Sequence, residues 1–155
     1  MNNTLKTQRN QRGFTLIELM IVIAIIGILI GAAVIGFRVA MKSGNEAATV
    51  QNLKTIAAVQ IQYHSTHGRT FATFEQLTKE EYLQTSKFGG NPPVTDGYVF
   101  TLKVVPKTAN SNSSYTLNAD PVDASSGTNH FFIDNNDSSI HFNATQPASV
   151  SDPVQ

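Results

Sequence analysis

The sequence has no cysteine among its 155 residues. Disulfides, thiolate zinc sites and cysteine nucleophiles are therefore all excluded. If the body of the chain is exported, packing alone has to hold its fold. A net charge is also missing, because 11 Lys and Arg balance 11 Asp and Glu. The chain therefore lacks the global basic field that would indicate a nucleic-acid partner.

Charge is absent from one long stretch in particular. From Leu19 to Phe37 the sequence LMIVIAIIGILIGAAVIGF contains neither a charged nor a polar side chain. A helix of this length covers about 28 Å, close to the roughly 30 Å of a bilayer's hydrocarbon core. A buried helix of a soluble protein normally keeps a polar stripe, and an ordinary signal peptide has a shorter apolar region. The stretch therefore predicts a transmembrane helix.

A basic segment precedes this helix. Lys6, Arg9 and Arg12 come before Phe14 with no acid among them. The positive-inside rule then predicts a cytoplasmic leader, with everything after the apolar stretch outside. Arg12-Gly13 looks like a processing site, and cleavage there keeps the hydrophobic helix on the mature chain.

One acid interrupts the apolar pattern. Glu18 lies one turn into the predicted helix, where a carboxylate is costly unless it is paired. One interpretation is that it reaches the headgroup layer. The other is that it pairs with a cation, and cleavage after Gly13 would create one at the α-amino group of Phe14. Within one helix that amine is poorly placed, so a neighbouring subunit would have to supply it.

The segment Arg12-Gly13-Phe14-Thr15-Leu16-Ile17-Glu18, followed by the apolar stretch, resembles the class III leader junction of type IV pilins and type II secretion pseudopilins. The close match covers residues 6–42. The resemblance implies that a prepilin peptidase cuts after Gly13, that Phe14 is N-methylated, and that Glu18 pairs with a neighbour's Phe14 amine. It also implies a homo-oligomeric filament assembled by inner-membrane pilus or secretion machinery.

Two departures from the family pattern concern the choice of filament. Many members have a proline at the position of Ile35, whereas this chain has Gly27, Gly31 and Gly36 nearby. Glycine weakens a helix by about 1 kcal/mol and proline by about 3. Local melting at these glycines on assembly is therefore an open expectation. The cysteine pair that closes a C-terminal loop in many major pilins is missing too.

The rest of the chain predicts an α+β head. An amphipathic helix is expected from Asn45 to Tyr63, ending at a Gly68 cap, with Ser43-Gly44-Asn45 as either a flexible point or a weak spot. Its predicted apolar face consists of Val50, Leu53, Ile56, Ala57, Val59, Ile61 and Tyr63. Thr73 and Gln76 form a capping box for a short helix over 74–83.

Three or four antiparallel strands complete the predicted head. Alternation marks Tyr98–Val105 and a strand from Tyr115 to Ala119. A hairpin is predicted from 130–134 and 139–143, with a two-residue turn at Asn136-Asp137 that sets Phe131 opposite Phe142 and Ile133 opposite Ile140. Residues 144–155 have no apolar pattern and are expected to form a loose tail.

The sequence evidence for metal and catalytic sites is weaker than that for the N-terminal motif. His64 and His67 have a spacing that can chelate, but no third ligand is suitably placed, so a solvated helix end is expected. In the predicted register, His130 and His141 point to the outer face. An acidic calcium loop formed by Asp120, Asp123, Asp134 and Asp137 is one interpretation, and turn chemistry explains these aspartates equally well. Asn112-Ser113-Ser114 is a glycosylation sequon, but a three-residue pattern of this kind is common by chance. No catalytic arrangement of residues and no cofactor are predicted.

These features predict a non-enzymatic filament subunit in four segments: a cleaved leader 1–13, a membrane and filament-core helix 14–42, a pilin-like head 43–143 and a tail 144–155. The expected location is the inner membrane before assembly, and a surface pilus or periplasmic pseudopilus afterwards. The alternatives are a type II secretion pseudopilin that drives protein export and a membrane-anchored binding module.

Overall fold

The computed structural model describes residues 13–155, so the basic leader, except Gly13, lies outside the described residues. The chain divides into two compact units, one reaching Phe37 and the other running from Arg38 to Gln155. Helix α1, Leu16–Thr66, contributes residues to both. Each unit is considered separately below.

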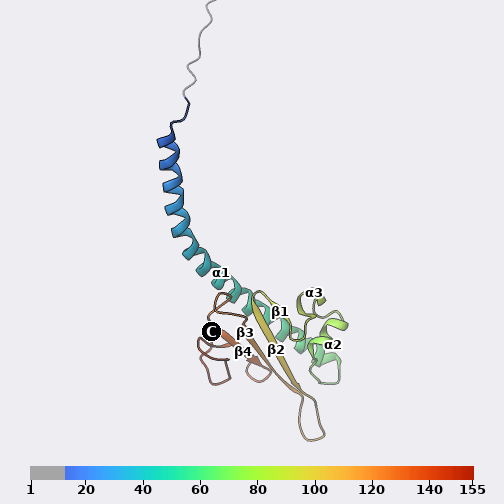
Figure 1. Ribbon diagram of the computed structural model, residues 1–155. Helices are drawn as coiled ribbons and strands as arrows, with labels where there is room; N and C mark the ends of the chain where they lie inside the picture. The colour runs from blue at the N-terminus through green and yellow to red at the C-terminus, as the bar shows by residue number, and fades with distance from the viewer. Residues whose placement is uncertain (1–12) are drawn as a thin grey trace, which may run out of the picture. The chain divides into compact units, whose positions relative to one another are not determined.

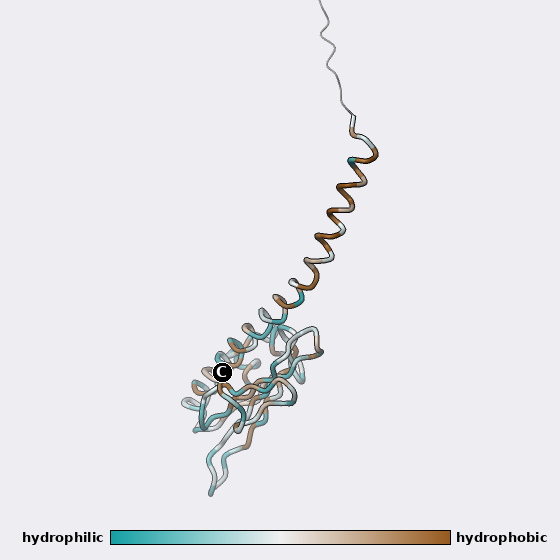
Figure 2. The backbone as a smooth tube through the Cα atoms, turned by 90° about the vertical axis from the view of Figure 1, so that its left-hand side faces the viewer, coloured by the Kyte–Doolittle hydropathy of each residue, from teal (hydrophilic) through white to brown (hydrophobic). Residues whose placement is uncertain are grey.

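The first unit is an apolar helix. Every residue of α1 up to Phe37 is exposed within the unit, including large side chains such as Ile28 and Ile35. Figure 2 shows this part of the tube as almost continuously hydrophobic. Among residues 13–155, α1 is one helix long and apolar enough to cross a membrane. The sequence prediction of an α+β fold with a long apolar N-terminal helix is confirmed.

The second unit begins with the remainder of α1. No break occurs at Ser43-Gly44-Asn45, because the helix continues without interruption to Thr66. Gly68 then takes a left-handed conformation with φ of 63°, as the predicted C-cap requires. The amphipathic pattern was recognised as far as Tyr63, and the end of the helix at Thr66 agrees with the predicted stop at Gly68.

Two short helices follow. Helix α2, Phe74–Lys79, starts with the predicted capping box between Thr73 and Gln76, and both reciprocal hydrogen bonds are present. It is shorter than predicted, and a separate helix α3, Thr85–Phe88, was not anticipated. The Leu83 amide donates to the Leu77 carbonyl (3.0 Å) and turns the chain between them.

The sheet has five antiparallel strands in the order of the sequence (Figure 1). They are β1 (Val94–Thr95), β2 (Tyr98–Val105), β3 (Ser114–Pro121), β4 (His130–Asp134) and β5 (His141–Asn143). Strands β2 and β3 pair along their whole length, from Tyr98 opposite Pro121 to Val105 opposite Ser114. The bounds of β2 agree with the prediction, whereas the two-residue strand β1 is additional.

The core lies between α1, the short helices and one face of the sheet. Tyr98, Phe100 and Leu117 are fully or almost fully buried there. The predicted apolar face of α1 is wrong at one position, because Ile61 is 60% exposed. The polar residues Thr49, Asn52 and Gln60 are buried instead. Gln60 is buried because it serves the backbone of a loop: its side-chain oxygen accepts from the Ala72 amide (2.9 Å), and its Nε2 donates to the Ala72 carbonyl (2.6 Å).

The predicted hairpin pairing is confirmed at Phe131 and Phe142, whereas the predicted pair of Ile133 with Ile140 is not part of the ladder and the predicted turn is wrong. Phe131 lies opposite Phe142, as predicted. Strand β4 ends at Asp134 and β5 begins at His141, so a six-residue loop replaces the expected two-residue turn. The Asp134 carboxylate fixes the start of this loop, because it accepts from the amides of Asn136 (2.9 Å) and Asp137 (3.0 Å).

The prediction of a loose tail was wrong. The Gln155 amide donates to the Ile140 carbonyl, and the Phe142 amide donates to the Pro153 carbonyl, both at 2.9 Å. Ala148 is only 4% exposed. These backbone hydrogen bonds hold the segment against β5 and the residue before it. The prediction failed because the hydropathy of a sequence does not indicate such bonds.

Candidate functional site

The start of α1 is built around Glu18. Thr15 is the residue before the helix, and Glu18 is the third residue inside it. Glu18 Oε2 accepts from the Thr15 amide (2.8 Å) and from the Thr15 hydroxyl (2.7 Å). The Glu18 amide in turn donates to Thr15 Oγ1 (3.3 Å). This is a capping box, which satisfies two backbone donors that a helix start otherwise leaves free.

The capping box gives Glu18 a role that the sequence prediction missed. The signal was present, because Thr15-Leu16-Ile17-Glu18 is a Thr-x-x-Glu pattern directly before an apolar stretch. Within residues 13–155, Glu18 Oε2 takes both hydrogen bonds and Oε1 takes none. One carboxylate oxygen is therefore engaged within the chain, and the other is available to an external donor.

Gly13 and Phe14 precede the helix, belong to no helix or strand and are exposed, with Phe14 92% exposed. Neither residue is covered by other described parts of the chain. Gly27, Gly31 and Gly36 lie within continuous helix, and a Cβ at any of them would meet no atom within 4 Å. The glycines therefore leave flat positions on the helix surface, and the helix is intact at each of them.

The four aspartates considered for calcium serve separate local contacts. Asp120 pairs with His130 Nδ1 (2.6 Å), and Asp137 pairs with His141 Nε2 (3.0 Å). Asp123 accepts from the Ser125 amide (2.7 Å), and hydrogen bonds from Ser125 and Ser126 lower the pKa of its carboxyl group. Within residues 13–155, no group of three or more acidic, histidine or cysteine side chains is placed to hold a metal ion.

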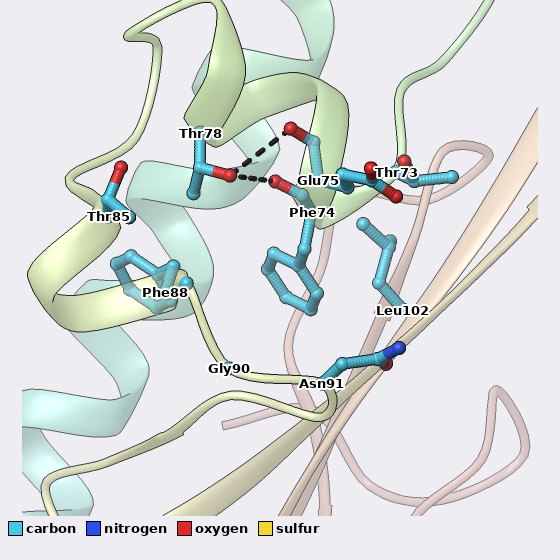
Figure 3. Close-up of a pocket in the computed structure, with 10 residues that line it drawn as sticks. Thr73, Phe74, Glu75, Thr78, Thr85, Phe88, Gly90, Asn91 and Leu102 are labelled. Atoms are coloured by element: carbon cyan, nitrogen blue, oxygen red, sulfur yellow. Dashed lines mark hydrogen bonds between the residues drawn. The ribbon is translucent and has the colours of Figure 1, made fainter.

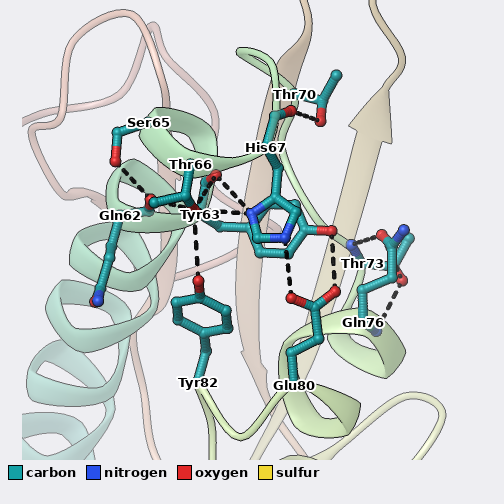
Figure 4. A network of polar contacts seen from close by, with 10 residues as sticks. All are labelled: Gln62, Tyr63, Ser65, Thr66, His67, Thr70, Thr73, Gln76, Glu80 and Tyr82. Atoms are coloured by element: carbon teal, nitrogen blue, oxygen red, sulfur yellow. Dashed lines mark hydrogen bonds and ion pairs between the residues drawn. The ribbon is translucent and has the colours of Figure 1, made fainter.

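His67 lies in a cluster at the end of α1 (Figure 4). Its ring stacks on Tyr63 with centroids 3.8 Å apart, and its Nε2 lies 3.0 Å from Glu80 Oε2. The Tyr63 hydroxyl donates to the other oxygen of Glu80 (3.4 Å). Burial, and then the Glu80 charge, raise the pKa of Tyr63. The partner of His67 is therefore Glu80 on the α2 side, and His64 instead stacks on Phe71.

An open pocket of about 520 Å³ lies beside α2 and α3 (Figure 3). Phe74, Phe88 and Leu102 form its apolar lining, and the rings of Phe74 and Phe88 are parallel at 6.1 Å. The Thr78 hydroxyl points back into its own helix, where it donates to the Phe74 carbonyl (2.9 Å). The pocket contains neither a nucleophile with a base nor a cluster of acids, so the side chains around it provide no catalytic arrangement.

Comparison with known proteins gives two matches. The family model described as the prokaryotic N-terminal methylation motif matches residues 8–34. A fimbrial protein from Moraxella nonliquefaciens is 38% identical over 99 residues, which cover 57% of this chain. The chain spans 62% of the length of that relative. No solved structure matches.

Proposed function

From the methylation motif and the fimbrial relative, which support the type IV pilin family, we propose that this chain is the structural subunit of a type IV pilus-like filament. A prepilin peptidase cuts after Gly13 and the new N-terminal Phe14 is methylated. The apolar helix anchors the subunit in the inner membrane and then forms the filament core. The head, from Arg38 onward, faces solvent.

The observation that carries the proposal is the continuous exposed apolar surface of α1 up to Phe37. Monomeric soluble proteins rarely expose a patch of this size, so lipid or other subunits must cover it. In the membrane the cover is lipid. In a filament the same surface packs against identical helices, and the flat positions at Gly27, Gly31 and Gly36 allow close approach.

Glu18 would set the axial register between subunits. Its Oε2 is held by Thr15, which fixes the direction of the carboxylate, while Oε1 accepts from no group in residues 13–155. A neighbour's Phe14 amine is a cation that fits this free oxygen. A carboxylate inside the membrane is destabilising when it has no partner. Pairing with the amine gives it a charge-assisted hydrogen bond, which offsets that cost.

Mass spectrometry of the mature N-terminus tests the processing step. Purified filaments or membranes should yield a chain that begins at Phe14 with one added methyl group. A Gly13→Ala variant should retain its leader and form no filaments. A mature chain that still begins at Met1 would remove the basis of the proposal.

The role of Glu18 can be separated from its capping function with three variants. Glu18→Gln keeps an oxygen for the Thr15 amide but has no charge, and glutamine is accepted in capping boxes. Thr15→Ala keeps the charge but removes the cap. We expect electron microscopy to show few or no filaments for Glu18→Gln and for Glu18→Ala, with Thr15→Ala close to wild type.

The opposite pattern, with filaments from Glu18→Gln and none from Thr15→Ala, would mean that capping alone explains Glu18. Immunoblots of membrane fractions provide the control, because every variant must still be present as an inserted chain. Processing after Gly13 is monitored on the same samples, so a failure of cleavage is not mistaken for a failure of pairing.

The relative from Moraxella nonliquefaciens is a fimbrial protein, which favours a surface pilus over a secretion pseudopilus. Deletion of the gene should therefore remove surface filaments and leave enzyme export intact. Loss of export with normal surface filaments would support the pseudopilin alternative.

A further inference from the structure

The C-terminal segment, residues 144–155, covers the outer edge of strand β5. Val154 forms an antiparallel bridge with His141, and the Phe142 amide donates to the Pro153 carbonyl (2.9 Å). An uncovered strand edge presents free amide and carbonyl groups that can pair with another chain. The segment therefore acts as a short additional strand that closes the sheet on this side.

Asp152 gives this segment its shape. One carboxylate oxygen accepts from Asn143 Nδ2 (2.8 Å), and the other accepts from the Ser149 amide (2.7 Å) and hydroxyl (2.9 Å). These hydrogen bonds, that from Asn143 first, lower the pKa of Asp152. The carboxylate is thus an acceptor for both β5 and its own loop.

His141 is the side chain that connects the segment to the rest of the head. The residue is only 5% exposed. Its Nδ1 lies 2.6 Å from the Asp152 carbonyl oxygen, and its Nε2 lies 3.0 Å from Asp137 Oδ2. Both neighbours are acceptors only. A neutral imidazole has one N–H and one lone pair, so only the imidazolium form can donate to both.

The groups that act electrostatically on His141 also favour a positive charge. They are the carboxylates of Asp137 in the loop, Asp134 at the end of β4 and Asp152 in the segment, together with the Asp152 backbone carbonyl, and no cation is among them. The ring of Phe132 packs beside the imidazole at 6.2 Å. The Asp152 hydrogen bond first, and then Asp137, raise the pKa of His141, while burial opposes them.

We propose that His141 is a pH-sensitive latch that, as an imidazolium, adds to the contacts that fasten residues 144–155 to the edge of β5, and that the segment loosens when the imidazolium loses its proton. In the neutral form, one lone pair faces either a carbonyl or a carboxylate oxygen, whichever tautomer forms. One of the two contacts then becomes repulsive, so His141 loses its hydrogen bond either to the Asp152 carbonyl of the segment or to the Asp137 carboxylate of the loop before β5.

The direction of the pH dependence follows from the raised pKa. The unfolded value for histidine is about 6.5. The latch contributes its full stabilisation below that value and loses it as the pH rises through the higher folded-state value. The C-terminal segment should therefore be held in mildly acidic medium and mobile in alkaline medium.

The lack of cysteine allows a direct test on the full chain in detergent micelles. A Val154→Cys variant carries a single nitroxide label at a position that is 55% exposed. The electron paramagnetic resonance spectrum should be that of a slowly moving label at about pH 5. A component from a rapidly moving label, the fast component, should grow as the pH is raised to about 9. We expect one transition with a midpoint above about 6.5.

Three further variants make the test specific. His141→Gln should give the fast component throughout, without a pH transition. Asp137→Asn should move the midpoint down by about one pH unit, because a neighbouring carboxylate no longer favours the cation. His130→Gln, which removes the histidine paired with Asp120, should leave the transition unchanged.

Several results would overturn the latch. A wild-type segment whose label mobility is constant from about pH 5 to 9 would do so, as would an unchanged transition in His141→Gln. A label at the exposed Val122 provides the last control. If it reports the same transition, the whole head unfolds with pH and the release is not local.

Discussion

The interaction between Gln60 and the Ala72 backbone gives the sharpest stability prediction. Both residues are 0% exposed, and the amide of Gln60 satisfies both the N–H and the C=O of Ala72. In Gln60→Met the side chain keeps a similar length but satisfies neither group. The loop between α1 and α2 then contains two buried backbone groups without partners.

Each buried group left without a hydrogen bond costs about 1–3 kcal/mol. We therefore expect Gln60→Met to lower the free energy of unfolding by roughly 2–6 kcal/mol, against a typical total of about 5–15. For a unit of this size the midpoint of thermal unfolding should fall by roughly 10–20 °C. All four tyrosines lie in the head, so near-ultraviolet circular dichroism of the full chain in micelles reports its unfolding.

Two variants complete this experiment. Gln62→Met changes an exposed glutamine two residues away and should shift the midpoint by less than about 2 °C. Gln60→Glu can still accept from the Ala72 amide, but as a carboxylate it cannot donate to the carbonyl. Burial raises the pKa of such a carboxyl, so its stability should be greater near pH 4 than near pH 7. Equal midpoints for Gln60→Met and Gln62→Met would refute the reasoning.

The remaining predictions concern two glycines and a buried hydroxyl. Gly127→Ala should lower stability by about 1–3 kcal/mol, because its Cβ would overlap the buried Tyr98 phenol. Gly44→Ala is the matched control: nothing lies within 4 Å of its new methyl group, and the helix should gain up to about 1 kcal/mol. Thr49→Val removes a buried hydroxyl that has no hydrogen-bond partner in residues 13–155, and should raise stability by about 1 kcal/mol. Urea titration of each variant provides the measurement, and a destabilised Thr49→Val would show that the hydroxyl has an unseen partner.

The elements that could be predicted are those whose signal lies in hydrophobic periodicity. Strand β2 was found with its bounds because Tyr98, Phe100 and Leu102 alternate with outward residues over eight positions. The pairing of Phe131 with Phe142 was found because the alternative turn would set Asp134 against Asp137, two like charges. Strand β1 has two residues, which is too short for any period to show.

The N-terminal site was predictable for a different reason. Glu18 stands out because it is an acid inside an apolar stretch, and this contrast requires no tertiary information. Its partner within the chain, Thr15, was missed, because the prediction considered only the charge of Glu18 and not the Thr-x-x-Glu capping pattern. The structure thus adds a local role for one carboxylate oxygen and leaves the other for the proposed contact between subunits.

Buried polar residues were beyond prediction from this sequence. Gln60 lies on the buried face because the loop after α1 passes over it and needs two hydrogen bonds. Glu46 is only half-buried but has a similar role: it accepts from the amides of Thr128 (2.7 Å) and Asn129 (3.2 Å), more than 80 residues away. Periodicity describes which face of a helix avoids water, and it contains no information about which distant backbone will lie against that face.

The same polar contacts change the conclusion drawn from the absence of cysteine. Packing alone was expected to hold the head, but side chains fasten its loops to α1 and to the sheet: Gln60 at Ala72, Glu46 at Thr128 and Asp152 at Ser149. A disulfide at the C-terminal segment would hold it at any pH in an oxidising medium. The contacts of His141 depend on a proton, so a chain closed in this way gains a dependence on pH that a disulfide would not provide.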